Sequence, residues 1–243
     1  MKRSLVVAMV LVASTSAYAH FKLNAPASMT VQSTNGSPQK SAPCGLSDDP
    51  GIADQSTKTN MVTTVQSGTM LAIKLNETIT HPGHYRVAIA QTAAMLPADP
   101  AVSPGGGFEC KTTTIMNPAV MPVLADGLFP HTGTLSGEQT AMVQIPAGFT
   151  CTNCVLQVTQ FMSNHGINNP GGCFYHHCAT VTVQAGPVPD GAPVGGDGAG
   201  TPDGGTMTGD DAGGCCSTDS NPTTSLIGTA LMALLLLRKR RAR

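Results

Sequence analysis

The histidine at position 20 has a place in the chain that gives it unusual chemistry. It follows an Ala-Tyr-Ala tripeptide, and the segment before it combines a Met-Lys-Arg start with an apolar run over residues 5–13. These are the three parts of a secretory signal peptide. Cleavage after residue 19 would make His20 the first residue, so its α-amino group and its imidazole Nδ1 could chelate one metal ion. Both groups deprotonate readily, because their ordinary pKa values lie at about 8 and about 6.5.

A second imidazole opposite this chelate would complete a T of three nitrogen donors, a histidine brace, and such planar nitrogen ligation favours Cu(II). We predict that His81 is this second ligand. The residue before proline is held in an extended conformation, and Gly83 permits a tight turn, so the His-Pro-Gly sequence fixes the direction of the backbone at His81. The other candidates for this role are His84, His131, His165, His176 and His177.

Composition excludes several other classes of protein. The 243 residues carry a net charge of −1, and only 11% of them are charged, so a broad basic surface for nucleic acid is not expected. The scattered carboxylates argue against a glycosidase pair. We find no nucleophile-elbow, P-loop, dinucleotide-binding or zinc-protease motif. Aromatic residues make up 4% of the chain, with no tryptophan.

The elements that would position these histidines are short strands. Period-2 alternation and runs of β-branched residues predict strands over residues 60–65, 70–75, 85–90, 141–145, 154–162 and 179–184. Turn clusters separate them, residues 91–123 are expected to form a long loop region, and no window outside the two ends has sustained helical periodicity. The predicted fold is all-β: an immunoglobulin/fibronectin-III-like antiparallel β-sandwich with long loops, over residues 20–185.

Six cysteines fall inside this domain. If the protein is exported, the oxidising compartment would convert them to three disulfides. Their sequence allows fifteen pairings of Cys44, Cys110, Cys151, Cys154, Cys173 and Cys178. The alternative is a zinc site made by the last four of these cysteines.

The two ends of the chain are expected to be accessory. Residues 1–19 are the predicted signal peptide, and residues 186–214 are a flexible linker rich in Gly, Pro and Asp. Residues 215–243 contain two adjacent cysteines, a short apolar stretch and a basic end. They resemble the myxobacterial-type C-terminal sorting signal, which implies an exported protein that is attached to the cell surface or outer membrane, or extracellular. A retained transmembrane helix used as a tail anchor is the alternative, although about 20 apolar residues are usual for a span.

Five segments together resemble the lytic polysaccharide monooxygenases and their histidine-brace relatives. They are, in the family's order, His20-Phe21, the Ala-Pro-Cys-Gly at 42–45, the His-Pro-Gly-His-Tyr at 81–85, the Cys-Thr-Asn-Cys-Val-Leu-Gln at 151–157 and the Phe-Tyr-His-His-Cys-Ala at 174–179. The resemblance implies an immunoglobulin-like sandwich with one copper ion held by His20 and His81. It implies Tyr175 at the axial position, or Phe174 if the alignment slips by one residue. It also implies that Gln157 or Gln160 supplies a hydrogen-bond donor beside the site.

Two functions follow from this resemblance. The first is oxidative cleavage of a chitin- or cellulose-like polysaccharide by a monomer that takes electrons from an external donor. The second is non-catalytic copper binding for capture or homeostasis. The chain departs from the family at Val158, Gln160 and Thr180, and sugar-stacking aromatics are scarce, with Tyr85 and Phe108 as the main candidates.

Overall fold

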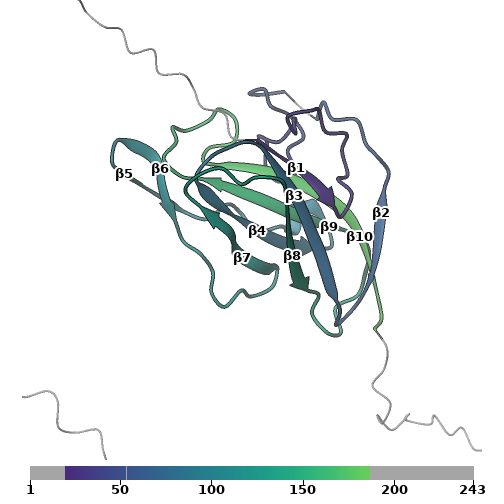
Figure 1. Ribbon diagram of the computed structural model, residues 1–243. Coiled ribbons are helices and arrows are strands. Elements are labelled where there is room, and N and C mark those ends of the chain that lie inside the picture. Colours follow the sequence, from purple (N-terminus) through teal and green to yellow (C-terminus); the bar gives the residue numbers. More distant parts are fainter. Residues whose placement is uncertain (1–19, 53, 187–243) are drawn as a thin grey trace, which may run out of the picture. The chain divides into compact units, whose positions relative to one another are not determined.

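The computed structural model describes residues 20–52 and 54–186, and their regular structure is almost entirely β-strand (Figure 1). The predicted signal peptide, nearly all of the predicted linker and the C-terminal sorting signal lie outside the described residues. Within the described ranges, no helix is long and apolar enough to cross a membrane. The described elements are β1 (His20–Ala25), β2 (Val62–Gln66), β3 (Met70–Ile79), β4 (Gly83–Ala90), η1 (Ala93–Met95), β5 (Val102–Gly105), β6 (Phe108–Thr113), β7 (Val123–His131), β8 (Glu138–Gln144), β9 (Cys151–Met162) and β10 (Phe174–Gln184).

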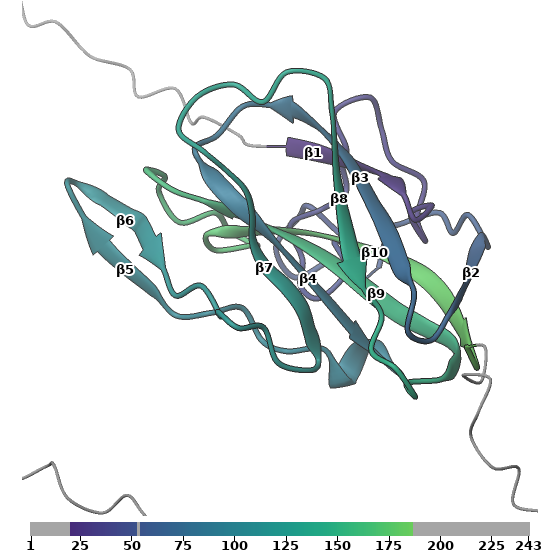
Figure 2. The same cartoon turned by 60° about the horizontal axis from the view of Figure 1, so that its bottom comes forward.

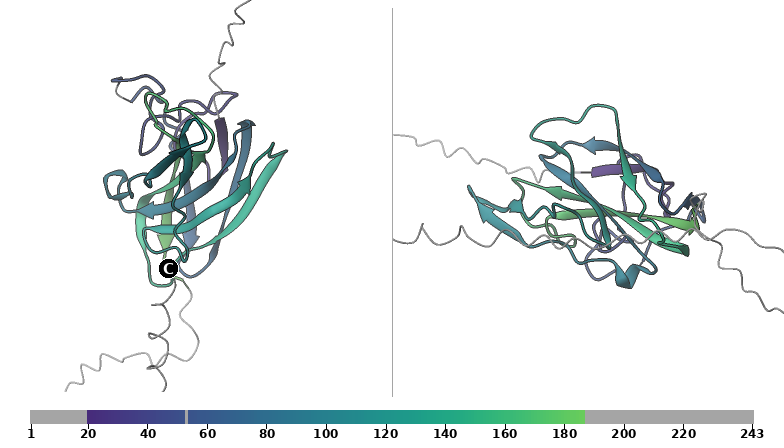
Figure 3. Two further views of the ribbon diagram at one scale, coloured as in Figure 1. Left: turned by 90° about the vertical axis from the view of Figure 1, so that its left-hand side faces the viewer. Right: turned by 90° about the horizontal axis from the view of Figure 1, so that it is seen from below.

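Two sheets pack face to face, which confirms the predicted all-β sandwich (Figures 1 and 3). One sheet has the order β1-β3-β8, and the other has the order β2-β10-β9-β4-β7. All pairs within the two sheets are antiparallel except β2 and β10, which run parallel. A separate hairpin of β5 and β6 extends away from the sheets (Figure 2).

The core lies between the two sheets and follows from strand periodicity. Along β3 every second residue is buried, so Leu71, Ile73 and Leu75 face the core. The same alternation directs Glu77 inward, at the end of this apolar row. Strand β9 is buried almost throughout its length, because the partner sheet covers one face and loops cover the other. It contacts β10 and β4, so residues of these three strands share rows across the sheet.

All six predicted strands are present, and four further strands escaped prediction. Residues 91–123 are not wholly loop, because they contain the β5–β6 hairpin. This hairpin joins neither sheet, contacts His165 through a single bridge at Cys110, and includes Pro104, so it lacks the apolar alternation that marks a core strand. Strand β7 contains Gly127 and Pro130 and pairs irregularly with β4 at the sheet edge. Strand β1 is short and directly follows the predicted signal peptide, whose apolar run obscures its pattern.

The six cysteines form three disulfides, as predicted from their even number. The pairs that sequence left open are Cys44–Cys178, Cys110–Cys173 and Cys151–Cys154. The first joins the loop after β1 to β10, and the second joins β6 to the turn before β10. The alternative zinc site is therefore wrong, because its four cysteines are all oxidised.

Candidate metal centre

His20 begins β1 beside a β-bulge. Phe21 pairs with Glu77 of β3, whereas His20 pairs with Ile79, so Thr78 between them has no partner on β1. Bulges re-aim side chains and recur next to functional sites. The His20 side chain is buried, and its ring centroid lies 5.3 Å from that of Tyr175.

His81 lies in the turn between β3 and β4, at the end of the sheets where His20 begins β1. It is two residues beyond Ile79, the partner of His20. A Cβ atom at Gly83 would collide with the carbonyl oxygen of Phe161, so only glycine allows this close approach of the turn to β9. This close approach to β9 holds the turn, and with it the backbone at His81, in place.

The ring of His81 is buried at this end of the sandwich. It is 5% exposed, and neither of its ring nitrogens makes a hydrogen bond of normal geometry with a described residue, although a contact with the Thr80 backbone acts on its pKa. Burial, together with the neighbouring ring of His165, lowers the pKa of His81 below its ordinary value. A neutral imidazole with an unengaged nitrogen is the form that binds a transition metal.

His165 is a neighbour of His81 that the sequence offered only as one candidate among six. The two ring centroids lie 4.6 Å apart, with the planes nearly perpendicular. His165 is held from the backbone, because its amide and carbonyl groups pair with those of Cys110, and Cys110 is bonded to Cys173. Its ring Nδ1 contacts the carbonyl oxygen of Gly166. The disulfide thus fixes the loop that brings this second imidazole to His81.

Glu77 is a buried carboxyl group at the centre of this end of the sandwich, and sequence reasoning missed it. Its Oε1 accepts hydrogen bonds from Gln160 Nε2 at 2.7 Å, from Tyr85 Oη at 3.4 Å and from the His81 backbone amide at 3.4 Å. The Nε2 of His131 lies 3.2 Å from the same oxygen. The missed signal was the alternation of β3, since the residue after Leu71, Ile73 and Leu75 in that inward series is Glu77.

His131 contacts the Glu77 carboxyl group. Its Nδ1 lies 2.8 Å from the carbonyl oxygen of Phe129 and its Nε2 lies beside the Glu77 carboxyl, so both ring nitrogens face acceptors. Burial alone would lower the pKa of His131, but these hydrogen bonds and the Glu77 charge outweigh it and raise that pKa. For Tyr85, burial and the adjacent Glu77 raise the pKa well above its ordinary value. The tyrosine therefore remains a protonated donor.

The two glutamines predicted beside the site face opposite sides of β9. Gln160 points into the sandwich, where it bonds Glu77 and shares a row with Tyr85 of β4 and Tyr175 of β10. Gln157 points outward and donates to the carbonyl oxygen of Pro43 at 2.8 Å. The structure therefore brings Gln160, and not Gln157, to the end that holds His20 and His81.

Tyr175 and Phe174, the alternatives for the axial position, are separated by the pleat of β10. Tyr175 is wholly buried on the inner face against His20. Phe174 lies on the outer face, with its ring 5.5 Å from that of Phe161. Of the two residues, Tyr175 is the one whose ring contacts that of His20.

Strand β1 is anchored by two polar side chains. The backbone amide of Phe21 donates to Gln39 Oε1 at 3.2 Å, and the carbonyl of Phe21 lies 3.0 Å from His177 Nε2. Burial, the largest influence, depresses the pKa of His177 to about 4, so the ring is neutral and donates through Nε2. His177 therefore holds the residue next to His20 and does not take part in the brace itself.

The remaining histidines lie elsewhere. His84 faces the outer side of β4, where its Nε2 is 3.9 Å from Asp126 Oδ1. His176 faces the outer side of β10 and pairs with Asp99. Among residues 20–52 and 54–186, no group of three or more His, Cys, Asp or Glu side chains is arranged to hold a metal ion. A site of two imidazoles and an α-amino group is not a group of that kind.

The expected sugar-stacking surface differs from the prediction. Tyr85 is wholly buried beneath Glu77 and Phe129, so it cannot stack on a ligand at the surface. Phe108, at the start of β6, is 40% exposed. The reason is the alternation of β4, which directs Tyr85, Val87 and Ile89 into the core.

Comparisons with known proteins add likenesses of fold. No protein-family model matches the chain, and no curated protein matches it. One similar solved structure is a lytic polysaccharide monooxygenase AA15 from Thermobia domestica in the Cu(I) state, with a TM-score of 0.45 and 18% identity over 68% of this chain and 98% of that chain. Another is a chitin binding domain from Burkholderia pseudomallei, with a TM-score of 0.35 and 10% identity over 68% of this chain and 100% of that chain. At these similarities the comparisons assign neither a family nor a function to the chain.

Proposed function

We propose that the mature chain begins at His20, is exported, and binds one copper ion through the α-amino group and ring of His20 and the ring of His81. We further propose that it oxidises C–H bonds at the glycosidic carbons of a chitin- or cellulose-like polysaccharide. This proposal rests on the sequence resemblance and on the residues gathered at one end of the sandwich.

The observation that carries the copper proposal is the state of His81. A buried polar atom normally has a hydrogen-bond partner, and neither ring nitrogen of His81 makes a hydrogen bond of normal geometry with a described residue. Its lowered pKa removes the competing proton. The donor set is entirely nitrogen, which suits Cu(II), and the residues present therefore fit the group.

Copper, when bound, supplies one-electron redox chemistry with an external electron donor. The residues of this chain would hold and shape the site. Tyr175 limits the space beside the His20 ring, because the two rings are in contact. Glu77 holds the backbone of His81 and the side chain of Gln160, so one carboxyl oxygen fixes both. The ring of His165 packs against that of His81 and restricts its position.

The test of this function is mass spectrometry of the products formed from chitin, cellulose and xylan. The exported protein is loaded with copper and reduced with ascorbate. Oxidised oligosaccharides are expected from the wild type and from His84→Ala, whose ring lies on the outer face of the sheet. His81→Ala should form none. Products that persist in His81→Ala would contradict the proposal.

A second function is favoured by one observation. Tyr85 is buried, so among the described aromatic residues Phe108 is the exposed one. A surface with so little aromatic area suits copper capture better than binding to a polysaccharide. Tight copper binding without oxidised products from any of the three polysaccharides would establish this alternative.

The C-terminal segment, residues 215–243, is proposed to attach the protein to the cell surface and to have no part in the copper site. A chain ending at residue 185 should then be found in the medium, with its copper binding intact. Retention of that shortened chain on the cells would contradict the attachment role.

A further inference from the structure

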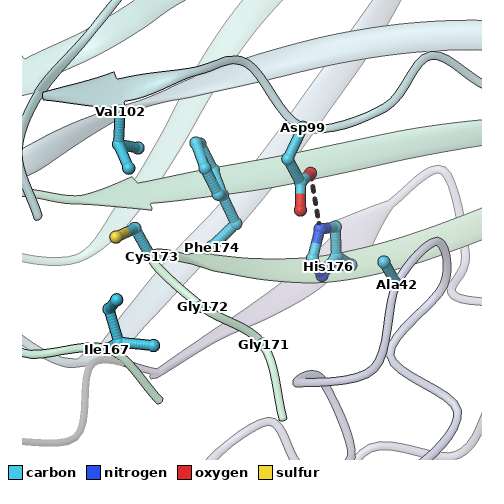
Figure 4. Close-up of a pocket in the computed structure, with 9 residues that line it drawn as sticks. All are labelled: Ala42, Asp99, Val102, Ile167, Gly171, Gly172, Cys173, Phe174 and His176. Carbon is cyan, nitrogen blue, oxygen red and sulfur yellow. Dashed lines mark hydrogen bonds and ion pairs between the residues drawn. The ribbon is translucent and has the colours of Figure 1, made fainter. Parts of the chain in front are cut away.

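A cavity of about 360 Å³ lies on the outer side of β10 (Figure 4). Its polar wall is made by Asp99 and His176, and Val102, Cys173 and Ile167 lie on the opposite wall. Phe174 lies between the two walls. From this arrangement we infer that the cavity is a binding site for one hexose unit, separate from the proposed copper site.

The pleat of β10 separates the two sites. Tyr175 faces the inner side and contacts His20, whereas its neighbours Phe174 and His176 face the outer side and line the cavity. Successive side chains of a strand point to opposite faces, so three consecutive residues serve both sides of one strand. The cavity contains neither predicted copper ligand.

His176 carries an unsatisfied polar atom in the wall of this cavity. The ring is wholly buried, and its Nε2 lies 2.8 Å from Asp99 Oδ1. Its Nδ1 is buried and has no hydrogen-bond partner among the described residues. A buried polar atom without a partner has lost its hydrogen bonds to water. A ligand that forms a hydrogen bond with this atom therefore binds without a further desolvation cost at that atom.

The pair of Asp99 and His176 sets the polarity that the ligand must have. The contact with Asp99 uses Nε2, so Nδ1 is the ring nitrogen left to bond a ligand. The Asp99 side chain is 29% exposed and retains further acceptor capacity beside the ring. Nδ1 and the Asp99 carboxylate lie at different edges of the ring, so they call for a ligand with several polar groups around its edge, such as hydroxyl groups.

The opposite wall calls for an apolar face on the same ligand. Val102, Phe174 and the Cys110–Cys173 disulfide form a surface that cannot bond hydroxyl groups. At about 360 Å³ the cavity is at the small end of ligand-binding pockets, so it suits one small ring. A pyranose combines these features, since its C–H groups form an apolar face and its hydroxyl groups line the edge. Ile167 is 63% exposed at this cavity, which leaves the site open to solvent.

The test uses the exported, metal-free protein, so its result does not depend on copper. Glucose, N-acetylglucosamine and cyclohexanol are titrated by NMR, because cyclohexanol has a six-membered ring with a single hydroxyl group. The sugars should bind at least about tenfold more tightly than cyclohexanol. Equal binding of cyclohexanol, or no binding of either sugar, would overturn the inference.

Substitutions locate the site. Asp99→Asn keeps the shape and an acceptor for Nε2–H but replaces the second carboxylate oxygen with a donor, so it should weaken sugar binding about tenfold or more. Asp54→Asn makes the same chemical change on an exposed loop and should have no effect. Ala42→Leu places a larger side chain at the cavity and should block binding with Asp99 and His176 intact. Sugar binding that survives both Asp99→Asn and Ala42→Leu would contradict the assignment.

Competition identifies the source of the hexose. If the free sugar displaces the protein from insoluble chitin or cellulose, the cavity holds a unit of a polysaccharide. If the free sugar binds without displacing it, the ligand is the monosaccharide itself. A failure of sugar binding leaves the copper proposal standing, and a failure of copper binding leaves this site standing, because the two experiments share no residue and no metal.

Discussion

A carboxyl group contacts a histidine on each side of the five-stranded sheet, but the surroundings of the two pairs differ. On the inner side, Glu77 Oε1 accepts hydrogen bonds from His81, Tyr85 and Gln160, and His131 Nε2 lies 3.2 Å from the same oxygen. On the outer side, Asp99 has a single histidine partner and is partly exposed. Both sides keep unused acceptors, since Glu77 Oε2 and Gln160 Oε1 have no hydrogen-bond partner among the described residues. The difference is exposure, because the Glu77 side chain is wholly buried and that of Asp99 is open to solvent. On β10 the pleat places Tyr175 on the inner side and the next residue, His176, on the outer side.

Residues that support the proposed copper site differ from residues that would bind the metal. Glu77, Gln160 and His177 fix the backbone or side chains around His20 and His81 without presenting a donor for the metal. Residues that only hold metal ligands in place change metal affinity less than the ligands themselves do. For His81, Glu77 and Gln160 we therefore compare an inner residue with an outer or exposed counterpart.

The largest effect is expected from the proposed ligand itself. His81→Ala should weaken Cu(II) affinity by more than about 100-fold, which exceeds the usual effect of losing a residue that only holds a ligand in place. His84→Ala removes an imidazole three residues away on the outer face and should leave the affinity unchanged. Titration of the metal-free protein with Cu(II) measures both. Equal losses in the two variants would show that the turn, and not the His81 ring, matters.

Removal of the central carboxyl group should have the largest effect on stability. Glu77→Ala leaves His131 and the other buried donors without their acceptor, so we expect a loss of roughly 3–5 kcal/mol in the free energy of unfolding. Glu138→Ala removes an exposed carboxylate that pairs with Lys74 at the surface, and it should change stability little. Urea denaturation at pH 7 compares them. A small loss for Glu77→Ala would contradict the central role of this carboxyl group.

The buried His177 should make stability depend on pH. Its pKa is depressed from 6.5 to about 4 in the folded protein, so between these pH values the unfolded chain binds the extra proton. Stability should therefore fall as pH decreases from about 6.5 to about 4, by on the order of 3 kcal/mol from this residue. His177→Gln keeps a donor for the Phe21 carbonyl and should flatten this dependence.

The His131–Glu77 contact acts in the opposite direction. The pKa of His131 is raised, so its contribution to stability is complete below the unfolded pKa and is lost as pH rises through the folded value. His131→Gln should remove that loss on the alkaline side while keeping the acidic one. Urea denaturation from pH 4 to 8 resolves the two histidines. An acidic dependence that persists in His177→Gln would show that another group is responsible for it.

The smallest effect is expected from the glutamines of β9. Gln160→Ala removes a donor to Glu77 and should lower copper affinity by about tenfold, acting through the position of His81. Gln157→Ala removes only the bond to Pro43 and should not alter the Cu(II) spectrum. Electron paramagnetic resonance provides a readout that general destabilisation would not change. A spectrum altered by Gln157→Ala alone would reverse the comparison between the two faces.

The sandwich was predictable because the sequence of its central strands shows alternation or β-branched residues. Leu71, Ile73 and Leu75 alternate, and β9 is rich in valine and threonine, so local sequence identifies both. The β5–β6 hairpin and β7 were missed because proline, glycine and edge positions break that alternation. The number of disulfides followed from export, but their pairing depends on contacts between residues up to 134 positions apart.

The candidate site was predictable only in part. His20, His81 and Tyr175 are found through motifs that lie in order along the chain. Glu77 was missed because a carboxyl group in an apolar row is read as the end of a strand, when here the strand continues to Ile79. Tyr85 was expected at the surface because its immediate neighbours are polar, yet the pleat of β4 turns it inward. The faces of Gln157 and Gln160 depend on register, which single-sequence patterns leave open.

The most direct test of the account is a count of the nitrogen atoms bound to copper. Electron paramagnetic resonance of the exported, Cu(II)-loaded protein should show superhyperfine coupling to three nitrogens, two from His20 and one from His81. The same spectrum of His81→Ala should lose one nitrogen, and an added alanine before His20 should disrupt the chelate. Three nitrogens that remain in both variants would contradict the histidine brace proposed for this protein.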